Sequence, residues 1–329
     1  MKRVAVCGFG FMGQNHTANI FRCKELELAA VVDATPKSEI KPVKGNVATD
    51  AFDWEKLNGI PFYSSLPEAL DRTGADAVLI ATPTRFHVPL ALEAVAHGKH
   101  VFVEKPLCFS LEDGEALKKA MAGKDLVFQV GHCVRFKNEY RILREACADR
   151  RYGKLKYLKL CRLTGKPNWG AWKNLDTSIP SASGPIFDLC IHDIDYALSL
   201  MGEPDDVSAR KSSYADSVFS AELQFAGGCR IEVEGGFMLP SPLPFRTGFF
   251  AVFEHAAMEY DSRLGDKITL STDDESKVVD TSMKETIYQA ELAEFVSAIT
   301  KGTPVQCGLE DGFKAIRWSH RLKDILTAK

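Results

Sequence analysis

The stretch RVAVCGFGFMG, residues 3–13, decides the fold class. It begins with an apolar run that predicts a buried strand, and three glycines with the spacing G-x-G-x-x-G then lead into a predicted helix. In this setting Gly8 permits a tight turn, Gly10 lets the backbone approach a pyrophosphate, and Gly13 lets the helix pack against the strand. The helix N-terminus then faces the phosphates, so the stretch predicts a dinucleotide site, with a plain tight turn as the alternative. The predicted cofactor-binding residues are Gly8, Phe9, Gly10, Phe11, Met12 and Gly13.

Strand–helix units continue from this stretch to about residue 122, because short apolar runs alternate with amphipathic stretches. The predicted strands are 3–8, 28–33, 61–63, 77–81, 100–103 and 126–130, with helices at 89–96 and 111–121. The polar, Lys-rich segment 35–58 predicts a loop-rich connection rather than a linker between domains. This half of the chain is therefore predicted to form a parallel sheet.

After about residue 150, apolar and polar residues alternate with period two, which is typical of half-buried antiparallel strands. The predicted strands are 154–162, 218–225, 229–234, 247–254, 256–260, 267–271 and 277–280, and helical periodicity returns at 285–300 and 309–326. Ala226-Gly-Gly228 is a hairpin signal between two of these strands. The fold class is thus α/β, with an N-terminal Rossmann domain over 1–123. A C-terminal α/β domain over 124–329, for substrate and oligomerisation, carries a mostly antiparallel sheet, and its last helices can pack back on the first domain.

Composition excludes several classes of protein. The 329 residues suffice for two domains, and a net charge of −3 gives no field for gripping a phosphate backbone, so nucleic acid is not expected as a partner. The nine cysteines are dispersed without a C-x-x-C pair, which favours reduced thiols over disulfides or a zinc site. The sequence predicts no secretory leader and no membrane span. We expect a cytoplasmic protein without a bound metal.

Asp33 ends the second predicted strand, twenty residues after Gly13. A carboxylate in this place accepts the hydroxyls of an adenosine ribose and repels a 2′-phosphate, which favours NAD over NADP. Lys37 is close enough in sequence to offset that repulsion, so NADP stays open as the cofactor. The alternative role for Asp33 is that of an ordinary turn residue.

Two polar segments follow the fourth and fifth strands, at the carboxyl ends where doubly wound sheets bind ligands. The segment 81–87 reads ATPTRFH, and Glu104-Lys105-Pro106 follows the apolar run VFV. An ammonium such as that of Lys105 stabilises a developing alkoxide and can relay a proton. The alternative is a surface Glu–Lys pair that caps a loop. The cofactor-binding residues predicted here are Thr82, Pro83, His87, Glu104 and Lys105.

A third polar group lies in the second domain, where a mostly apolar helix carries Asp188, His192 and Asp195 on one predicted stripe. The stripe can line a substrate cleft with His192 as a proton acceptor. It can equally be a satisfied internal network or a metal site. The sequence alone leaves the three alternatives open.

Together these motifs resemble the glucose-fructose oxidoreductase, inositol dehydrogenase and rhizopine-catabolism (GFO/IDH/MocA) family. The resemblance covers nearly the whole chain: VAVCGFGFMGQNH, then ATPTRFHVPLALEAVAHGKHVFVEKPL, then GPIFDLCIHDIDYAL, and finally ELAEFVSAITKGTPV with GLEDGFKAI. It implies a Rossmann domain followed by an α/β domain with a large open sheet, through which homodimers or homotetramers often form.

The resemblance also implies roles for individual residues. The lysine of the family's E-K-P motif falls on Lys105, and the aspartate and histidine of its D-x-x-x-H-D motif fall on Asp188 and His192. It implies that His192 takes the hydroxyl proton, that Asp188 tunes it, and that the Lys105–Pro106 peptide is cis. One departure is Ser183-Gly-Pro185, where many relatives have two glycines. Candidate sugar-binding residues in the loop 166–179 are Trp169, Trp172 and Asn174.

We therefore expect an NAD(P)-dependent dehydrogenase that acts on CH–OH groups of a sugar, cyclitol or related polyol, with Lys105, His192 and Asp188 as catalytic residues. Two alternatives remain. One is a non-catalytic NAD(P)-binding regulatory protein, which needs the glycine loop but not the other motifs. The other is an NAD-dependent glycosidase with redox-neutral turnover.

Overall fold

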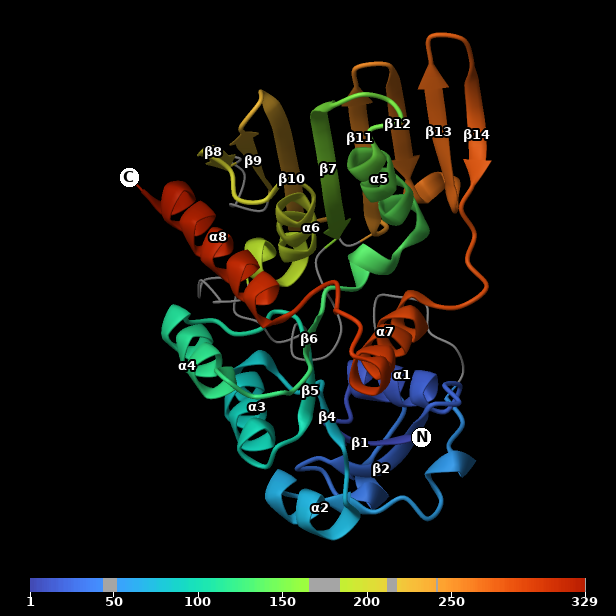
Figure 1. Cartoon of the computed structure of the whole chain (residues 1–329), viewed down its shortest axis with the longest axis vertical. Coiled ribbons are helices and arrows are strands. Elements are labelled where there is room, and N and C mark those ends of the chain that lie inside the picture. The colour runs from blue at the N-terminus through green and yellow to red at the C-terminus, as the bar shows by residue number, and fades with distance from the viewer. Residues whose placement is uncertain (44–51, 166–183, 212–217, 241, 329) are drawn as a thin grey trace. The chain divides into compact units, whose positions relative to one another are not determined.

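The computed structural model describes residues 1–43, 52–165, 184–211, 218–240 and 242–328, which form two compact units (Figure 1). Unit 1 comprises Met1–Cys133 and Glu285–Phe313, and unit 2 comprises Val134–Lys284 and Lys314–Lys329. None of the helices within the described ranges combines the length and apolar character needed to cross a membrane.

Unit 1 contains a six-stranded parallel sheet with the order β3-β2-β1-β4-β5-β6. Its strands are β1 (Lys2–Cys7), β2 (Leu26–Val32), β3 (Phe62–Tyr63), β4 (Ala77–Ile80), β5 (His100–Glu104) and β6 (Phe128–Gly131). From β1 the chain adds β2 and β3 on one side and then β4, β5 and β6 on the other, which is the dinucleotide-binding topology. The predicted Rossmann fold is confirmed, and its ligand crevice is expected beside the carboxyl ends of these two strands.

Helices cover both faces of this sheet. They are α1 (Phe11–Ile20), α2 (Leu66–Thr73), α3 (His87–Ala96), α4 (Leu111–Met121) and α7 (Ile287–Lys301), with 3₁₀ turns η1 (Lys37–Glu39), η2 (Glu55–Leu57) and η3 (Thr84–Phe86). Figure 1 shows α2, α3 and α4 on one face and α1 with α7 on the other. A capping box of Thr286 and Gln289 starts α7. Phe295 of this helix lies edge-on to Phe102 in the core, with 5.8 Å between ring centroids. A pair of this kind adds about 1 kcal/mol to simple burial.

Unit 2 contains an eight-stranded sheet with the order β14-β13-β12-β11-β7-β10-β9-β8. Its strands are β7 (Leu155–Gly165), β8 (Asp206–Lys211), β9 (Val218–Phe225), β10 (Cys229–Leu239), β11 (Arg246–Phe253), β12 (Ala256–Asp261), β13 (Lys267–Thr272) and β14 (Ser276–Asp280). Neighbouring strands are antiparallel except β7 and β10, so the predicted mixed, mostly antiparallel sheet is confirmed. The predicted hairpin joins β9 to β10, and Gly227 and Gly228 both have φ of +83° there. Only β8 was not expected from the sequence.

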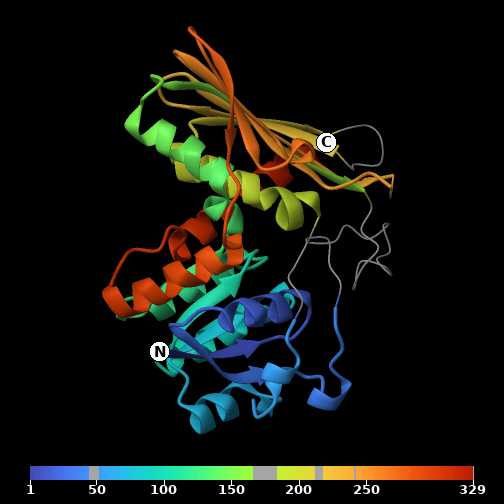
Figure 2. The ribbon, with the colours of Figure 1, turned by 90° about the vertical axis from the view of Figure 1, so that its right-hand side faces the viewer.

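The helical elements of unit 2 pack against this sheet. They are η4 (Cys133–Phe136, from Val134 on), α5 (Asn138–Asp149), the π-helical turn η6 (Ile186–Cys190), α6 (Ile191–Met201), η7 (Ser262–Leu264) and α8 (Leu309–Thr327, from Lys314 on). Figure 2 shows α5 and α6 along the same face of the sheet. The π turn was not predicted, because an uninterrupted α-helical period was assumed through residue 195.

Candidate active site

The three glycines of the loop after β1 are held for different reasons. Gly8 has φ of +85°, and a Cβ atom there would lie 2.8 Å from the Ala81 carbonyl carbon. A Cβ on Gly13 would lie 1.9 Å from the Gly8 carbonyl oxygen, so close packing of α1 requires this glycine. A Cβ on Gly10 would meet no atom of the described residues within 4 Å. The chain itself therefore does not require glycine at position 10, whereas a pyrophosphate approaching the backbone does.

The N-terminus of α1 is also prepared for an anion. Gly10 is its N-cap residue, no side chain caps it, and no acidic residue lies in its first turn. The first amides of a helix need acceptors and carry a partial positive charge. The predicted cofactor residues Phe11 and Met12 lie in this turn and are half-buried. The loop and helix together fit a bound dinucleotide phosphate.

Asp33 directly follows β2, and the glycine loop fixes its carboxylate. Oδ2 accepts the Phe9 backbone N–H at 2.6 Å, and Oδ1 accepts the Thr35 N–H at 2.8 Å. The Phe9 ring itself is buried, edge-on to Phe52 and Phe62. Each carboxylate oxygen keeps a further lone pair for a ribose hydroxyl. Phe9 thus contributes its backbone, not its ring, to this edge of the sheet.

Lys37 does not point its charge at Asp33. Its ammonium donates to the Leu57 carbonyl at 2.8 Å and to the Ile60 carbonyl at 3.1 Å, and it lies 5.1 Å from the centre of the Phe62 ring. Because its ammonium has these other partners, Lys37 does not offset the charge of Asp33.

His87 joins the segment after β4 to the segment after β5. Its Nε2 is 2.8 Å from the Thr82 carbonyl oxygen, and its Nδ1 is 2.9 Å from the Pro106 carbonyl oxygen. The ring is buried, and burial lowers the pKa of His87. A neutral ring carries one N–H, so His87 donates to one of these carbonyl oxygens and contacts the other, which keeps Thr82 and Pro106 on either side of the ring. Pro83 is exposed at the same strand end.

Glu104 is the last residue of β5 and is buried, so it is not half of an exposed Glu–Lys pair. Its Oε1 is 2.6 Å from Nε2 of His16, and its Oε2 accepts the Lys105 backbone N–H at 3.1 Å. Lys105 is half-buried, and the Lys105–Pro106 peptide is cis, as predicted. Glu104 therefore fixes the backbone of the lysine that follows it.

In unit 2, Asp188 lies in the π turn η6 and His192 in the first turn of α6. Of residues 186–198, only these two are not buried. The turn packs on β10, where a Cβ on Gly235 would lie 1.8 Å from the Cys190 sulfur. Single π turns within helices are frequent at functional sites. The exposure pattern separates Asp188 and His192 from their buried neighbours.

Asp195 has a different role from the one that the predicted stripe gave it. It is buried and receives Nε and Nη2 of Arg135 at 2.7 and 2.6 Å. Its neighbour Asp193 receives Nε and Nη2 of Arg162 at 2.7 and 3.0 Å. Asp195 therefore belongs to a satisfied internal pair, which was one of the alternatives, and the π turn interrupts the helical period that aligned it with Asp188.

Sequence reasoning missed the polar residues buried in unit 1. His16 is fully buried in α1, as are Gln14, Asn15, Thr17 and Asn19 nearby. Glu291 of α7 is buried as well. A helix this rich in polar residues and yet buried needs internal partners, and that composition was the available signal. Trp169, Trp172 and Asn174 lie outside the described residues.

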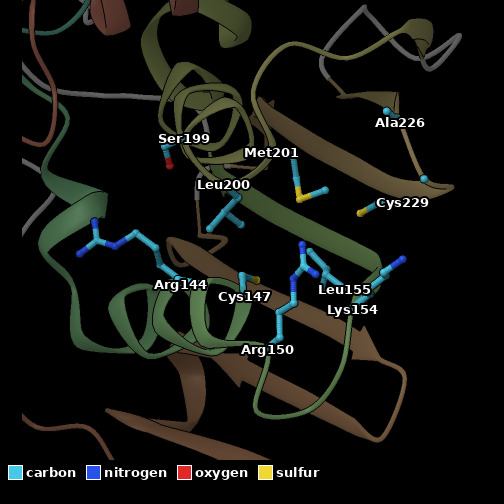
Figure 3. A pocket seen from close by; sticks show the side chains of 12 residues that line it. Arg144, Cys147, Arg150, Lys154, Leu155, Ser199, Leu200, Met201, Ala226 and Cys229 are labelled. Atoms are coloured by element: carbon cyan, nitrogen blue, oxygen red, sulfur yellow. The ribbon is translucent and has the colours of Figure 1, made fainter.

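A cavity of about 440 Å³ in unit 2 lies apart from the predicted site residues (Figure 3). It opens at the C-terminal ends of α5 and α6, where Leu200 and Met201 contribute apolar surface. Its cationic side chains are Arg144, Arg150 and Lys154. Cations just beyond a helix C-terminus interact favourably with its free carbonyls, which accounts for Arg150. None of the predicted site residues lines this cavity, so it is not the candidate active site.

Comparison with known proteins places both halves of the chain. A family model described as an oxidoreductase family with an NAD-binding Rossmann fold matches residues 2–132. A second model, described as the GFO/IDH/MocA C-terminal domain, matches residues 140–251. The first match spans all six strands of the unit 1 sheet, the second spans β7 to β10 and most of β11 in the unit 2 sheet, and together they cover most of the chain.

Individual relatives match along nearly the full length. Myo-inositol 2-dehydrogenase of Thermotoga maritima is 26% identical, over 99% of this chain and 97% of its own. The structure of UDP-N-acetylglucosamine 3-dehydrogenase GnnA from Acidithiobacillus ferrooxidans superposes with a TM-score of 0.81, at 23% identity over 98% and 97% of the chains. That of scyllo-inositol dehydrogenase from Lactobacillus casei, with bound NAD(H) and scyllo-inositol, gives 0.80, at 20% identity over 99% and 97%.

Proposed function

The chain belongs to the GFO/IDH/MocA family of oxidoreductases, and from this premise we propose that it transfers a hydride between a nicotinamide and a CH–OH carbon of a sugar, cyclitol or related polyol. It is an NAD(P)-dependent dehydrogenase, as its named relatives are. Relatives such as the inositol dehydrogenases supply the substrate class, and the residues of this chain supply the roles below.

The cofactor we propose is NAD, with NADP as the alternative. The residues that would hold it are the glycine loop 8–13 for the pyrophosphate and Asp33 for the adenosine ribose. Two observations favour NAD: the Asp33 carboxylate is fixed by backbone amides, and the nearby Lys37 ammonium is engaged by carbonyls. A fixed carboxylate repels a 2′-phosphate, and the Lys37 ammonium, engaged by two carbonyls, does not offset that charge. When bound, the nicotinamide supplies the hydride acceptor.

The catalytic residues we propose are Lys105 from unit 1 and His192 with Asp188 from unit 2. In oxidation, His192 takes the hydroxyl proton as the C–H bond breaks and its electron pair leaves as hydride, so that the carbon becomes a carbonyl. Lys105 stabilises the alkoxide that forms on the way, because the positive charge of its ammonium group close to that oxygen lowers the energy of the alkoxide. Asp188 orients and tunes His192.

One observation carries the proposal. His87 links the Thr82 and Pro106 carbonyls, and Gly8 packs directly on Ala81. The glycine loop, the end of β4 and the turn of Lys105 are thereby connected at one edge of a single sheet. A cationic side chain beside a dinucleotide-binding loop is suited to hydride chemistry, whereas a cofactor sensor does not need it.

The first test is a screen of cyclitols, polyols, aldoses and sugar acids with NAD and with NADP, with reduced nicotinamide followed by absorbance. Replacing Lys105 by methionine should then lower turnover of the best substrate at least about a hundredfold, which is the scale for losing a group that stabilises developing negative charge. NAD affinity, measured by fluorescence titration, should persist. Unchanged turnover in this variant would reject the role of Lys105. Tight NAD binding without turnover of any compound favours a regulatory protein or a redox-neutral glycosidase.

Further parts of the proposal concern the whole protein. We propose a dinucleotide-binding domain and a substrate domain, with the boundary predicted at 123/124 moved beyond β6, because that strand belongs to the sheet of unit 1. We also propose substrate contacts from Trp169, Trp172 and Asn174, and a homodimer or homotetramer formed through the sheet of unit 2. All nine cysteines are free thiols, which supports a reducing, cytoplasmic location. The net charge of −3 supports the absence of a nucleic-acid partner.

A further inference from the structure

Two buried carboxyl groups lie in unit 1, and the mechanism above uses neither. Glu104 ends β5, and Glu291 lies in α7. The side chain of Glu104 is 9% exposed, and Glu291 is fully buried. Two buried carboxylates that interact cannot both carry charge cheaply, so one of them is expected to stay protonated. Their hydrogen-bond partners decide which one.

The partners of Glu104 favour its charged form. Nε2 of His16 and the backbone N–H of Lys105 both donate to its two oxygens. Hydrogen bonds to an ionised acceptor are about twice as strong as neutral ones. The carboxylate also lies next to Gly131, since a Cβ added to this glycine would be 3.4 Å from Cδ and Oε2 of Glu104. Glu104 is therefore enclosed, with its oxygens committed to these two donors.

The surroundings of Glu291 favour its neutral form. Neither of its oxygens has a hydrogen-bond partner within the described part of the chain. Burial, and then the charges of Glu104 and Glu294, raise the pKa of Glu291 well above its ordinary value. Burial acts to raise the pKa of Glu104 too, but the hydrogen bond of His16 and electrostatic interactions with His16, Lys105 and His87 lower it overall.

We infer that His16 and Glu104 are positioning residues for Lys105: the His16 hydrogen bond places one negative charge on Glu104, and Glu104 fixes the backbone from which the lysine side chain extends. Glu291 is the neutral neighbour and has no part in this positioning. The ring of His16 is itself fixed, edge-on to Phe102 at 5.2 Å and to Tyr288 at 5.8 Å between centroids. His16 of α1 thus holds Glu104 at the end of β5, and Glu104 holds the backbone of Lys105.

The inference rests on the proposed role of Lys105, and two matched substitutions test it separately. Glu104→Gln and Glu291→Gln make the same chemical change in two buried side chains of one unit. We expect Glu104→Gln to lower kcat about tenfold to a hundredfold, because a charged acceptor of the Lys105 N–H becomes neutral. The KM for NAD should change by a smaller factor than kcat, because the glycine loop and Asp33, which are proposed to hold most of the cofactor, are untouched. Glu291→Gln should leave kcat within about twofold of wild type.

Stability against pH gives a readout that does not need the substrate. Because the folded pKa of Glu104 is lowered, its contribution is present above its ordinary value of 4.5 and is lost as the pH falls through the folded pKa. Because the folded pKa of Glu291 is raised, its contribution is lost as the pH rises above 4.5. Relative to wild type, the Tm of Glu104→Gln should therefore fall as the pH rises toward about 5 and then stay level, whereas the Tm of Glu291→Gln should rise as the pH increases above about 5.

The outcomes separate the two proposals. If Lys105→Met leaves turnover unchanged, the proposed function fails. If Lys105→Met abolishes turnover but Glu104→Gln behaves like Glu291→Gln in kcat or in the pH trend of Tm, the positioning inference is overturned. Should Glu104→Gln not fold, His16→Gln and His16→Leu decide, because glutamine keeps an N–H donor and leucine does not. At least about tenfold higher kcat in His16→Gln than in His16→Leu supports the inference, and equal rates overturn it.

Discussion

Replacing Gly235 by alanine should displace the π turn that carries Asp188. The new Cβ would lie 1.8 Å from the sulfur of Cys190, which is fully buried, so one of the two side chains or its backbone must shift. Overpacking of this kind costs about 1–3 kcal/mol. For a unit of this size, each kcal/mol lowers Tm by about 2–4 °C. Because Asp188 is two residues from Cys190, a shift of about 1 Å should also lower turnover about a hundredfold.

The reasoning is tested by a second substitution that removes the clashing atom. Cys190→Ala alone should cost about 1 kcal/mol through lost buried contacts. In the double variant the nearest Cys190 atom is Cβ, which would lie 3.4 Å from the new Cβ, an acceptable contact. Thermal unfolding followed by circular dichroism should therefore show the double variant to be more stable than Gly235→Ala, with a coupling of about 1–2 kcal/mol. A double variant that is no more stable than Gly235→Ala refutes the clash.

Two further pairs of substitutions can be compared in the same assays. Gly10→Ala should leave Tm within about 1 °C, because the added Cβ meets no atom within 4 Å in the part of the chain that the structure describes. It should weaken NAD binding at least about tenfold. Gly13→Ala should lower both Tm and NAD affinity, because its Cβ would lie 1.9 Å from the Gly8 carbonyl oxygen. Equal Tm values for Gly10→Ala and Gly13→Ala would contradict this. Asp193→Asn should cost about 3–5 kcal/mol by leaving Arg162 buried without a charge partner. Arg162→Met with Asp193→Leu should recover most of that stability but not turnover, and full turnover in this double variant would count against a role for the pair in the site.

Elements with a clear period of their own were predictable from the sequence. The strand β9 (Val218–Phe225) and the helix α4 (Leu111–Met121) have the predicted bounds, because buried and exposed residues alternate with the period of each element. The strand β8 (Asp206–Lys211) was missed because none of its six residues is buried. It is an edge strand that pairs with β9 alone, so tertiary pairing rather than sequence pattern determines it.

The candidate site divides in the same way. The glycine loop and Asp33 are local signals, since their spacing follows from one strand–turn–helix unit. The partners of the charged residues are not local: His16 and Glu104 are 88 residues apart, and Arg135 and Asp195 are 60 apart. Nothing in the sequence near Glu104 indicates a buried histidine as its partner. The π turn likewise depends on the small residue Gly235 in a strand that follows much later in the chain.

The two buried ion pairs of α6 have a consequence for His192. Asp193 and Asp195 are two residues apart, so in a helix with about 100° per residue they point to nearly opposite sides. Arg162 of β7 holds one side, and Arg135 of η4 holds the other. Buried pairs add little net stability compared with apolar packing, because desolvation offsets their attraction. What two such pairs do determine is the rotation of the helix about its axis. His192 projects into the arc between them, so the ion pairs that Arg162 and Arg135 make with its two neighbours in the helix fix its direction.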